Sequence, residues 1–105
     1  MTRERLPNRR ASLTVTAAWA GRAINVSVGY SRDGRILELF ARDARRVDSE
    51  RDRTVDDAAV LVSRALQHGD MLSDIGKGLG RLPYGSPSSI IGLLADAALS
   101  LDIAR

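Results

Sequence analysis

Apolar and polar residues alternate in two segments near the start of the chain. From Ser12 to Trp19 the apolar positions are Leu13, Val15, Ala17 and Trp19, and from Ile24 to Tyr30 they are Ile24, Val26, Val28 and Tyr30. A period of two is typical of a strand with one buried face. Ala20-Gly21 lies between the two segments and suits a turn. We therefore predict two antiparallel strands joined as a hairpin.

A third strand is predicted from Arg35 to Ala41. The tetrapeptide Ser31-Arg32-Asp33-Gly34 precedes it and suits a tight turn, because glycine accepts the positive φ that such turns require. Apolar residues of this segment, including Phe40, fall on both faces, and Glu38 is the exception. We therefore expect the third strand to be the most buried of the three.

The segment from Arg42 to Arg53 contains five arginines and four acidic residues, without an apolar period. This composition predicts a solvated loop. A helix is then expected to begin at a Thr54 cap, with Asp56 and Asp57 near its positive end, and to end at Gly69. Its apolar stripe is formed by Val55, Ala58, Val62, Ala65 and Leu66, and Leu61 joins the stripe at its edge.

Two more helices are predicted towards the C-terminus. Asp70 can cap a short helix that carries Met71, Leu72, Ile75 and Leu79, and Ser86 or Ser88 can begin the last helix, whose apolar residues are Ile90, Ile91, Leu94, Ala97, Ala98 and Leu101. Three strands followed by three helices predict an α+β fold, with the helices packed on one face of a three-stranded antiparallel sheet. The 105 residues fit one domain, 12–105, preceded by a basic arm, 1–11.

Catalytic chemistry is poorly represented in the sequence. The absence of cysteine excludes thiolate catalysis and cysteine-ligated metals, and the single histidine, His68, lies at a predicted helix end. Asp56 and Asp57 would point about 100° apart on a helix, so they cannot face each other as a catalytic pair. The glycines between Gly76 and Gly80 lack both the spacing of a phosphate-binding loop and a preceding strand. We predict no catalytic residue, no metal and no cofactor.

The net charge of +3 is concentrated in the arm, which carries Arg3, Arg5, Arg9 and Arg10 against Glu4. Guanidinium groups can bind phosphates or carboxylates through two hydrogen bonds, so these four arginines are the predicted binding residues. A solvated tail is the alternative. The arm has no aromatic residue for base stacking, which favours a protein partner over nucleic acid. No apolar run reaches the roughly 18 residues that cross a bilayer, so we expect a cytoplasmic protein without membrane contact.

Several stretches together resemble a known family. They are Arg3-Glu4-Arg5-Leu6-Pro7 with Arg10 and Ser12, then Val28-Gly29, Asp33-Gly34-Arg35, Glu38 and Phe40, and finally Ser63 to Gly69. In order and spacing they are similar to the TSCPD domain, the C-terminal domain of adenosylcobalamin-dependent (class II) ribonucleoside-diphosphate reductases. Small free-standing TSCPD proteins of proteobacteria and their mobile elements are similar too. The likeness spans nearly the whole chain.

The resemblance implies an accessory interaction module linked to deoxynucleotide supply, which docks to a reductase subunit or a nucleotide-metabolism enzyme. The reductase's catalytic barrel, radical cysteine, cobalamin site and C-terminal cysteine pair have no counterpart here, and the Thr-Ser-Cys-Pro-Asp signature is missing. Ribonucleotide reduction by this chain alone is therefore not implied. The alternatives are a nucleic-acid-binding protein, a mobile-element protein that modulates a host protein, and an enzyme with an unrecognised site. An open sheet edge would also allow a homodimer.

Overall fold

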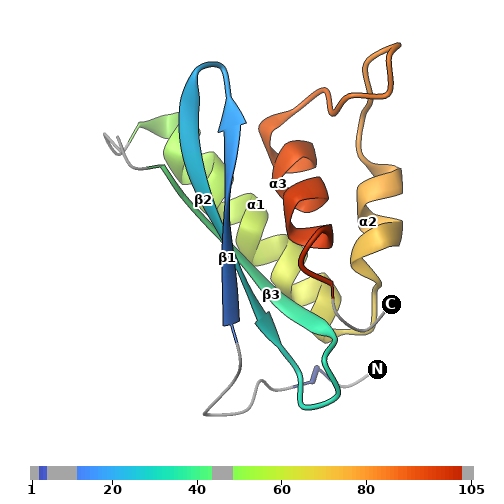
Figure 1. Cartoon of the computed structure of the whole chain (residues 1–105). Helices are drawn as coiled ribbons and strands as arrows, with labels where there is room; N and C mark the ends of the chain where they lie inside the picture. Colours follow the sequence, from blue (N-terminus) through green and yellow to red (C-terminus); the bar gives the residue numbers. More distant parts are fainter. Residues whose placement is uncertain (1–2, 5–11, 44–48, 103–105) are drawn as a thin grey trace.

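The computed structural model describes residues 3–4, 12–43 and 49–102. The elements follow in the predicted order, three strands and then three helices (Figure 1). Their bounds are β1 Ser12–Trp19, β2 Arg22–Tyr30, β3 Ile36–Asp43, α1 Glu50–Gln67, α2 Leu72–Gly78 and α3 Ile90–Leu99. The predicted α+β fold is confirmed.

The three strands form an antiparallel meander in the order β1-β2-β3. The turn between β1 and β2 consists of Ala20 and Gly21, whose φ angles are 50° and 77°. Positive φ at both central residues is the requirement of a type I′ hairpin turn, whose twist matches that of the strands. From Ser12↔Gly29 to Trp19↔Arg22 the pairing is regular, whereas β2 and β3 shift register between Gly29 and Tyr30.

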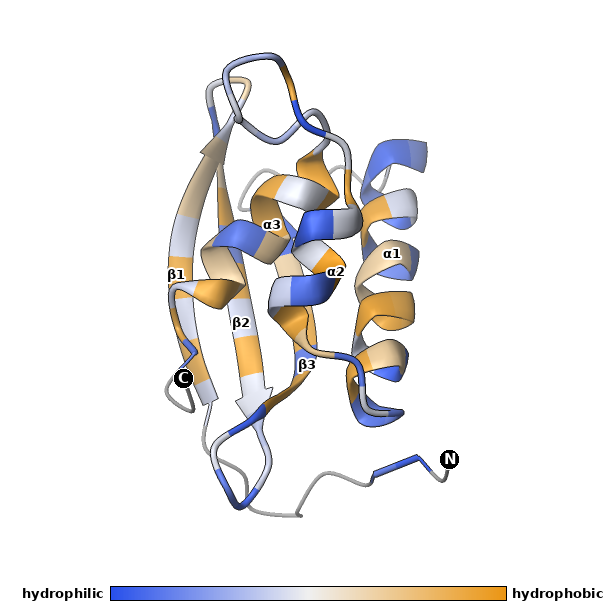
Figure 2. Ribbon diagram, turned by 90° about the vertical axis from the view of Figure 1, so that its right-hand side faces the viewer, coloured by the Kyte–Doolittle hydropathy of each residue, from blue (hydrophilic) through white to orange (hydrophobic). Residues whose placement is uncertain are grey.

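The core lies between one face of the sheet and the helices. Central strand β2 contributes Ile24, Val26, Val28 and Tyr30, all buried. Helices α1 and α3 cover this face directly, and α2 packs against α3 (Figure 2). The helices add Val55, Val62, Leu66, Leu72, Leu94, Ala95 and Ala98 to the same core. Alternation along the strands therefore identified the buried face correctly.

Strand β3 differs from the expectation for the third strand. Its first four residues, Ile36 to Leu39, are buried, but Phe40 is 53% exposed and the strand continues to Asp43. Glu38, the expected exception, is only 5% exposed. Its carboxylate lies against Gly29, where an added Cβ would clash with the Glu38 side chain. Only glycine at position 29 leaves room for this arrangement. The expectation that β3 is buried therefore holds for its first half, Ile36 to Leu39, and not for its second half.

Helix α1 begins earlier than predicted. Its N-cap is Ser49, whose hydroxyl accepts a hydrogen bond from the Asp52 N–H at 3.2 Å, while Asp52 accepts one from the Ser49 N–H at 3.3 Å. This capping box replaces the predicted Thr54 cap and places 50–53 in the helix rather than in a loop. Asp56 and Asp57 lie inside the helix rather than at its cap. Residues 44–48 of the predicted loop lie outside the described residues.

The predicted end of α1 is confirmed. Gly69 has a φ of 111°, and its N–H donates to Leu66 O while the Asp70 N–H donates to Ala65 O. This pair of bonds is the Schellman motif, which satisfies carbonyls at a helix end. The predicted caps of the other two helices were wrong. The N-cap position of α2 is Met71 instead of Asp70. The N-cap of α3 is Ser89 instead of Ser86 or Ser88, and its hydroxyl accepts a hydrogen bond from the Gly92 N–H at 3.2 Å. Leu61, which was expected only at the edge of the apolar stripe on α1, is exposed.

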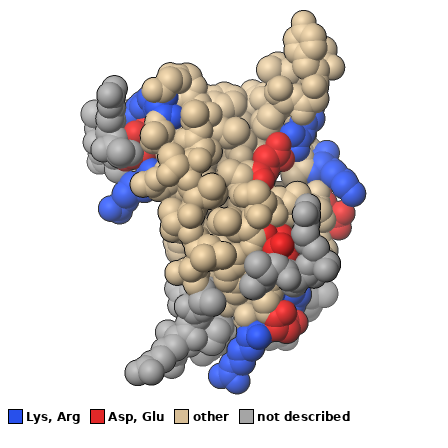
Figure 3. Space-filling model, viewed as in Figure 1, with Lys and Arg blue, Asp and Glu red and all other residues tan. Residues whose placement is uncertain are grey.

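Arg81 ties the loop between α2 and α3 to the helix that follows. Its two terminal nitrogens donate to the two carboxylate oxygens of Asp96 at 2.7 and 2.8 Å. Further bonds reach the carbonyls of Gly76 at 3.3 Å and Gly85 at 3.4 Å. One side chain therefore holds both ends of a loop that projects from the molecule (Figures 1 and 3).

We expect Asp96→Asn to lower the free energy of unfolding by about 0.2–1 kcal/mol at neutral pH, the range for an exposed ion pair. The hydrogen bond from Arg81 lowers the pKa of Asp96. A lowered pKa in the folded state means that the stabilisation is complete above the unfolded value of about 3.9 and is lost as the pH falls through the folded value.

Urea unfolding of wild type and variant, at neutral pH and in acid, measures this effect. The difference in the free energy of unfolding between wild type and Asp96→Asn should disappear in acid. Asp57→Asn, on the exposed side of α1, is the control. A difference that persists unchanged in acid would contradict the assignment.

No helix among the described residues is long and apolar enough to cross a membrane.

Candidate binding site

The face of the sheet turned away from the helices carries two rows of polar side chains. The register aligns Thr14 with Ser27 and Phe40, and Thr16 with Asn25 and Arg42, because paired residues on adjacent strands point to the same side. These are the polar positions of the alternation on β1 and β2, together with Phe40 and Arg42 from β3. We call this surface the outer face.

Hydrogen bonds within the rows fix the side chains of the outer face. The Thr14 and Ser27 hydroxyls lie 2.8 Å apart, and the Thr16 hydroxyl donates to Asn25 Oδ1 at 2.9 Å. Hydroxyl and amide groups have more than one hydrogen-bonding position, so each pair can still bond to a ligand. The outer face is therefore an ordered polar surface.

A groove of about 730 Å³ lies where the outer face meets α1. Its lining residues are Thr14, Asn25, Ser27, Phe40, Ala41, Arg42, Asp56, Ala59 and Val60. Phe40 and Val60 are both large apolar residues with about half of their surface exposed. Arg42 and Asp56 have opposite charges, so the groove has no strong net charge. We call it the outer groove.

The wall of the outer groove is fixed because α1 is hydrogen-bonded to the edge of β3. The Ser63 hydroxyl accepts from the Leu39 N–H at 2.9 Å and donates to Leu39 O at 3.2 Å. One helical turn later, Gln67 Nε2 donates to Leu37 O at 3.0 Å. Buried side chains thus take the place of a neighbouring strand at this edge.

The first described residues of the arm dock at the C-terminal end of α1. Arg3 donates from Nε to Gln67 Oε1, and the Glu4 N–H donates to Gln67 O at 2.7 Å. Glu4 also forms an ion pair with Arg35 at 2.5 Å. Of the four predicted binding residues, Arg3 is thus bonded to the protein itself. Arg5, Arg9 and Arg10 lie outside the described residues, and their role stays a prediction.

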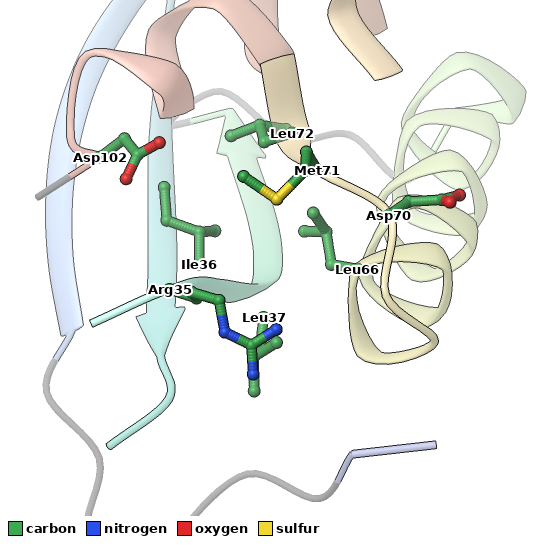
Figure 4. A pocket seen from close by; sticks show the side chains of 8 residues that line it. All are labelled: Arg35, Ile36, Leu37, Leu66, Asp70, Met71, Leu72 and Asp102. Carbon is green, nitrogen blue, oxygen red and sulfur yellow. The ribbon is translucent and has the colours of Figure 1, made fainter. Parts of the chain in front are cut away.

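A small pocket of about 110 Å³ lies beside this docking point (Figure 4). It is lined by Arg35, Ile36, Leu37, Leu66, Asp70, Met71, Leu72 and Asp102. Arg35 bonds to Glu4 and, from Nε, to Asp33 at 3.2 Å. A hydrogen bond from Ser31 is the main cause of the lowered pKa of Asp33, and Arg35 adds to it. Two carboxylates therefore already hold the guanidinium, and the pocket is too small for a nucleotide.

The other residues considered from the sequence do not come together. His68 is exposed at the C-cap of α1, Asp56 and Asp57 lie on the same helix, and the glycine-rich segment spans the end of α2. Within the parts of the chain that are described, no group of three or more His, Cys, Asp or Glu side chains could hold a metal ion.

Sequence reasoning missed the outer groove for two reasons. Phe40 was assigned to a buried strand, although the pairing of alternate positions places it beside Ser27 on the outer face. The early start of α1 also went unrecognised, so Asp56 was treated as a capping residue rather than as part of a wall. The sequence contained a signal for the second reason only: the spacing of Ser49 and Asp52 is that of a capping box, which marks the start of a helix.

Comparison with family models, curated proteins and solved structures gives no match for this chain. The similarity to TSCPD domains therefore stays a prediction from the sequence motifs.

Proposed function

We propose that this chain is a non-catalytic binding module whose outer groove holds a segment of a protein partner. The observation that carries the proposal is the placement of Phe40, 53% exposed among ordered hydroxyl and amide groups and beside Val60. Exposed aromatic side chains in a concave, partly polar setting are typical centres of protein interfaces.

The charge of the outer groove favours a protein over nucleic acid. Nucleic acid binding draws most of its affinity from several cations that face the phosphate backbone. The lining of the groove contains one cation, Arg42, and one anion, Asp56. It also offers Phe40 as the one aromatic side chain for stacking. A polypeptide with apolar side chains and backbone amides fits this lining better than a polyanion does.

The identity of the partner is proposed from the family resemblance. A class II ribonucleotide reductase, or another enzyme of deoxynucleotide supply, is the expected partner. In support, motif residues from three distant stretches are joined by hydrogen bonds: Glu4 to Arg35, and Arg3 to Gln67. A third motif pair, Gly29 and Glu38, is in close contact. These contacts give the motif residues a shared structural role, and Arg5, Arg9 and Arg10 remain proposed further contacts.

We expect Phe40→Ala to weaken binding of the partner at least tenfold, because truncation of an aromatic side chain at the centre of an interface costs about 2 kcal/mol or more. The measurement is biolayer interferometry with the immobilised chain and a purified class II ribonucleotide reductase. Leu61→Ala is the matched control, since Leu61 is an exposed apolar residue on α1 that does not line the groove.

Three outcomes would count against the proposal. The first is the absence of binding to the reductase together with recovery of no nucleotide-metabolism enzyme by affinity capture. The second is equal loss of binding in the Phe40 and Leu61 variants, which would place the contact elsewhere. The third is binding of single-stranded DNA or RNA with a steep salt dependence, which would favour the nucleic-acid alternative.

A further inference from the structure

We propose that β1 pairs with β1 of a second copy of this chain, antiparallel across a two-fold axis, to form a continuous six-stranded sheet. The inference goes beyond the proposed function, because it concerns the opposite edge of the sheet from the wall of the outer groove. It would hold whatever the groove binds.

The two edges of the sheet differ in how their backbone groups are hydrogen-bonded. The β3 edge is covered by α1, whose Ser63 and Gln67 side chains bond to the backbone of Leu39 and Leu37. At β1, within the described residues, the only backbone partner is β2. Backbone donors and acceptors along this free edge match those of another extended strand.

The register shows which backbone groups of β1 have no partner among the residues that the structure describes. The two-residue turn makes Trp19 and Arg22 a hydrogen-bonded pair, and such pairs alternate with non-bonded ones along an antiparallel ladder. Odd-numbered residues of β1 thus bond to β2, whereas the even-numbered ones turn their N–H and C=O groups outwards. The outward residues are Ser12, Thr14, Thr16 and Ala18.

β1 lacks the features by which proteins normally prevent pairing at an edge. Its eight residues, Ser12 to Trp19, include no charged residue, proline or glycine, and its pairing with β2 has no bulge. Charges, prolines, bulges and short length are the usual protection of an edge strand. In the view that faces β1 and α3, the central part of the surface shows no charged side chain, and acidic groups lie to its right (Figure 3).

The sequence of β1 is complementary to itself in one register. With the two-fold axis at Val15, each Thr14 pairs with Thr16 of the other copy, and each Leu13 pairs with Ala17. The outward groups then bond to outward groups, and equivalent faces of the two sheets coincide. Leu13, a 47% exposed apolar residue on the helix-covered face, gains an apolar neighbour from the second copy.

The mass of the purified full chain tests the pairing. Sedimentation velocity over a concentration series should show a dimer that dissociates on dilution. We expect Thr16→Pro to weaken dimerisation at least tenfold, because proline has no N–H to donate across the new edge. The Thr16 N–H points away from β2, so the hairpin itself is retained, which circular dichroism checks.

Thr16→Val is the control. It removes the hydroxyl and its bond to Asn25 but keeps the N–H, so it should still dimerise. Phe40→Ala should also remain dimeric, because Phe40 lies two strands away from β1. A failure of the groove proposal is thereby distinguishable from a failure of this one.

Amide hydrogen exchange of the wild-type chain provides a test that needs no variant. In a β1-paired dimer, the amides of Thr14 and Thr16 are protected, and their protection falls on dilution. In a monomer they face solvent and exchange fast, while those of Val15 and Ala17 stay protected by β2. A monomer at all concentrations, a Thr16→Pro variant that dimerises like wild type, or fast exchange at Thr14 and Thr16 in the dimer would overturn the proposal.

Discussion

Replacing Ser63 with alanine is expected to lower the free energy of unfolding by about 2–3 kcal/mol. The Ser63 hydroxyl is the partner of both backbone groups of Leu39, at 2.9 and 3.2 Å, in a buried setting. Alanine leaves the N–H and the C=O of Leu39 without a partner, and each buried unsatisfied group costs about 1–3 kcal/mol.

Urea unfolding followed by circular dichroism measures the effect of Ser63→Ala. Arg64→Ala is the matched control, since Arg64 is the next residue on α1 and is exposed. Its effect should stay below about 0.5 kcal/mol, as for most surface substitutions. If both variants unfold at the same urea concentration as wild type, α1 does not cover the edge of β3 as described.

Replacing Leu94 with alanine is expected to cost about 3 kcal/mol of the free energy of unfolding. Leu94 is fully buried on α3, a helix that contacts β1, β2, α1 and α2. Removing a buried leucine side chain loses its transfer free energy and leaves a cavity, with a total cost of about 2–5 kcal/mol in protein cores. Because α3 packs against several separate elements, we do not expect them to close the cavity together.

Leu93→Ala makes the same chemical change one residue earlier on α3, at a position that is only half-buried. We expect it to cost less than half as much as Leu94→Ala in the same denaturant titration. An equal cost for the two variants would show that the buried side of α3 has been assigned wrongly.

The sheet could be predicted from the sequence because its signals are local. Alternation along Ser12–Trp19 and Arg22–Tyr30 specifies the faces, and Ala20-Gly21 specifies the hairpin, so no distant contact had to be known. The end of α1 was equally readable, since Gly69 adopts the positive φ that a helix end uses. These elements were enough to give the fold class.

The start of α1 was misread because its first turn is charged and carries little apolar surface. Ser49 and Asp52 stabilise that turn through capping rather than through packing. The spacing of apolar residues does not indicate capping. The outer groove was missed for a related reason. It exists only where the second half of β3 meets α1, and the position of α1 depends on the buried Ser63 and Gln67 contacts.

The order of the elements along the chain has a consequence for folding kinetics. Each strand pairs with the next in sequence, and α1 follows β3, so these contacts close short loops. Helix α3 instead returns to β1 and β2, and Tyr30 bonds to Leu101 across 71 residues of chain. Contacts between distant residues form slowly, so α3 is expected to dock last. Until it does, the apolar face of the hairpin is uncovered, and aggregation competes with folding most strongly during that interval.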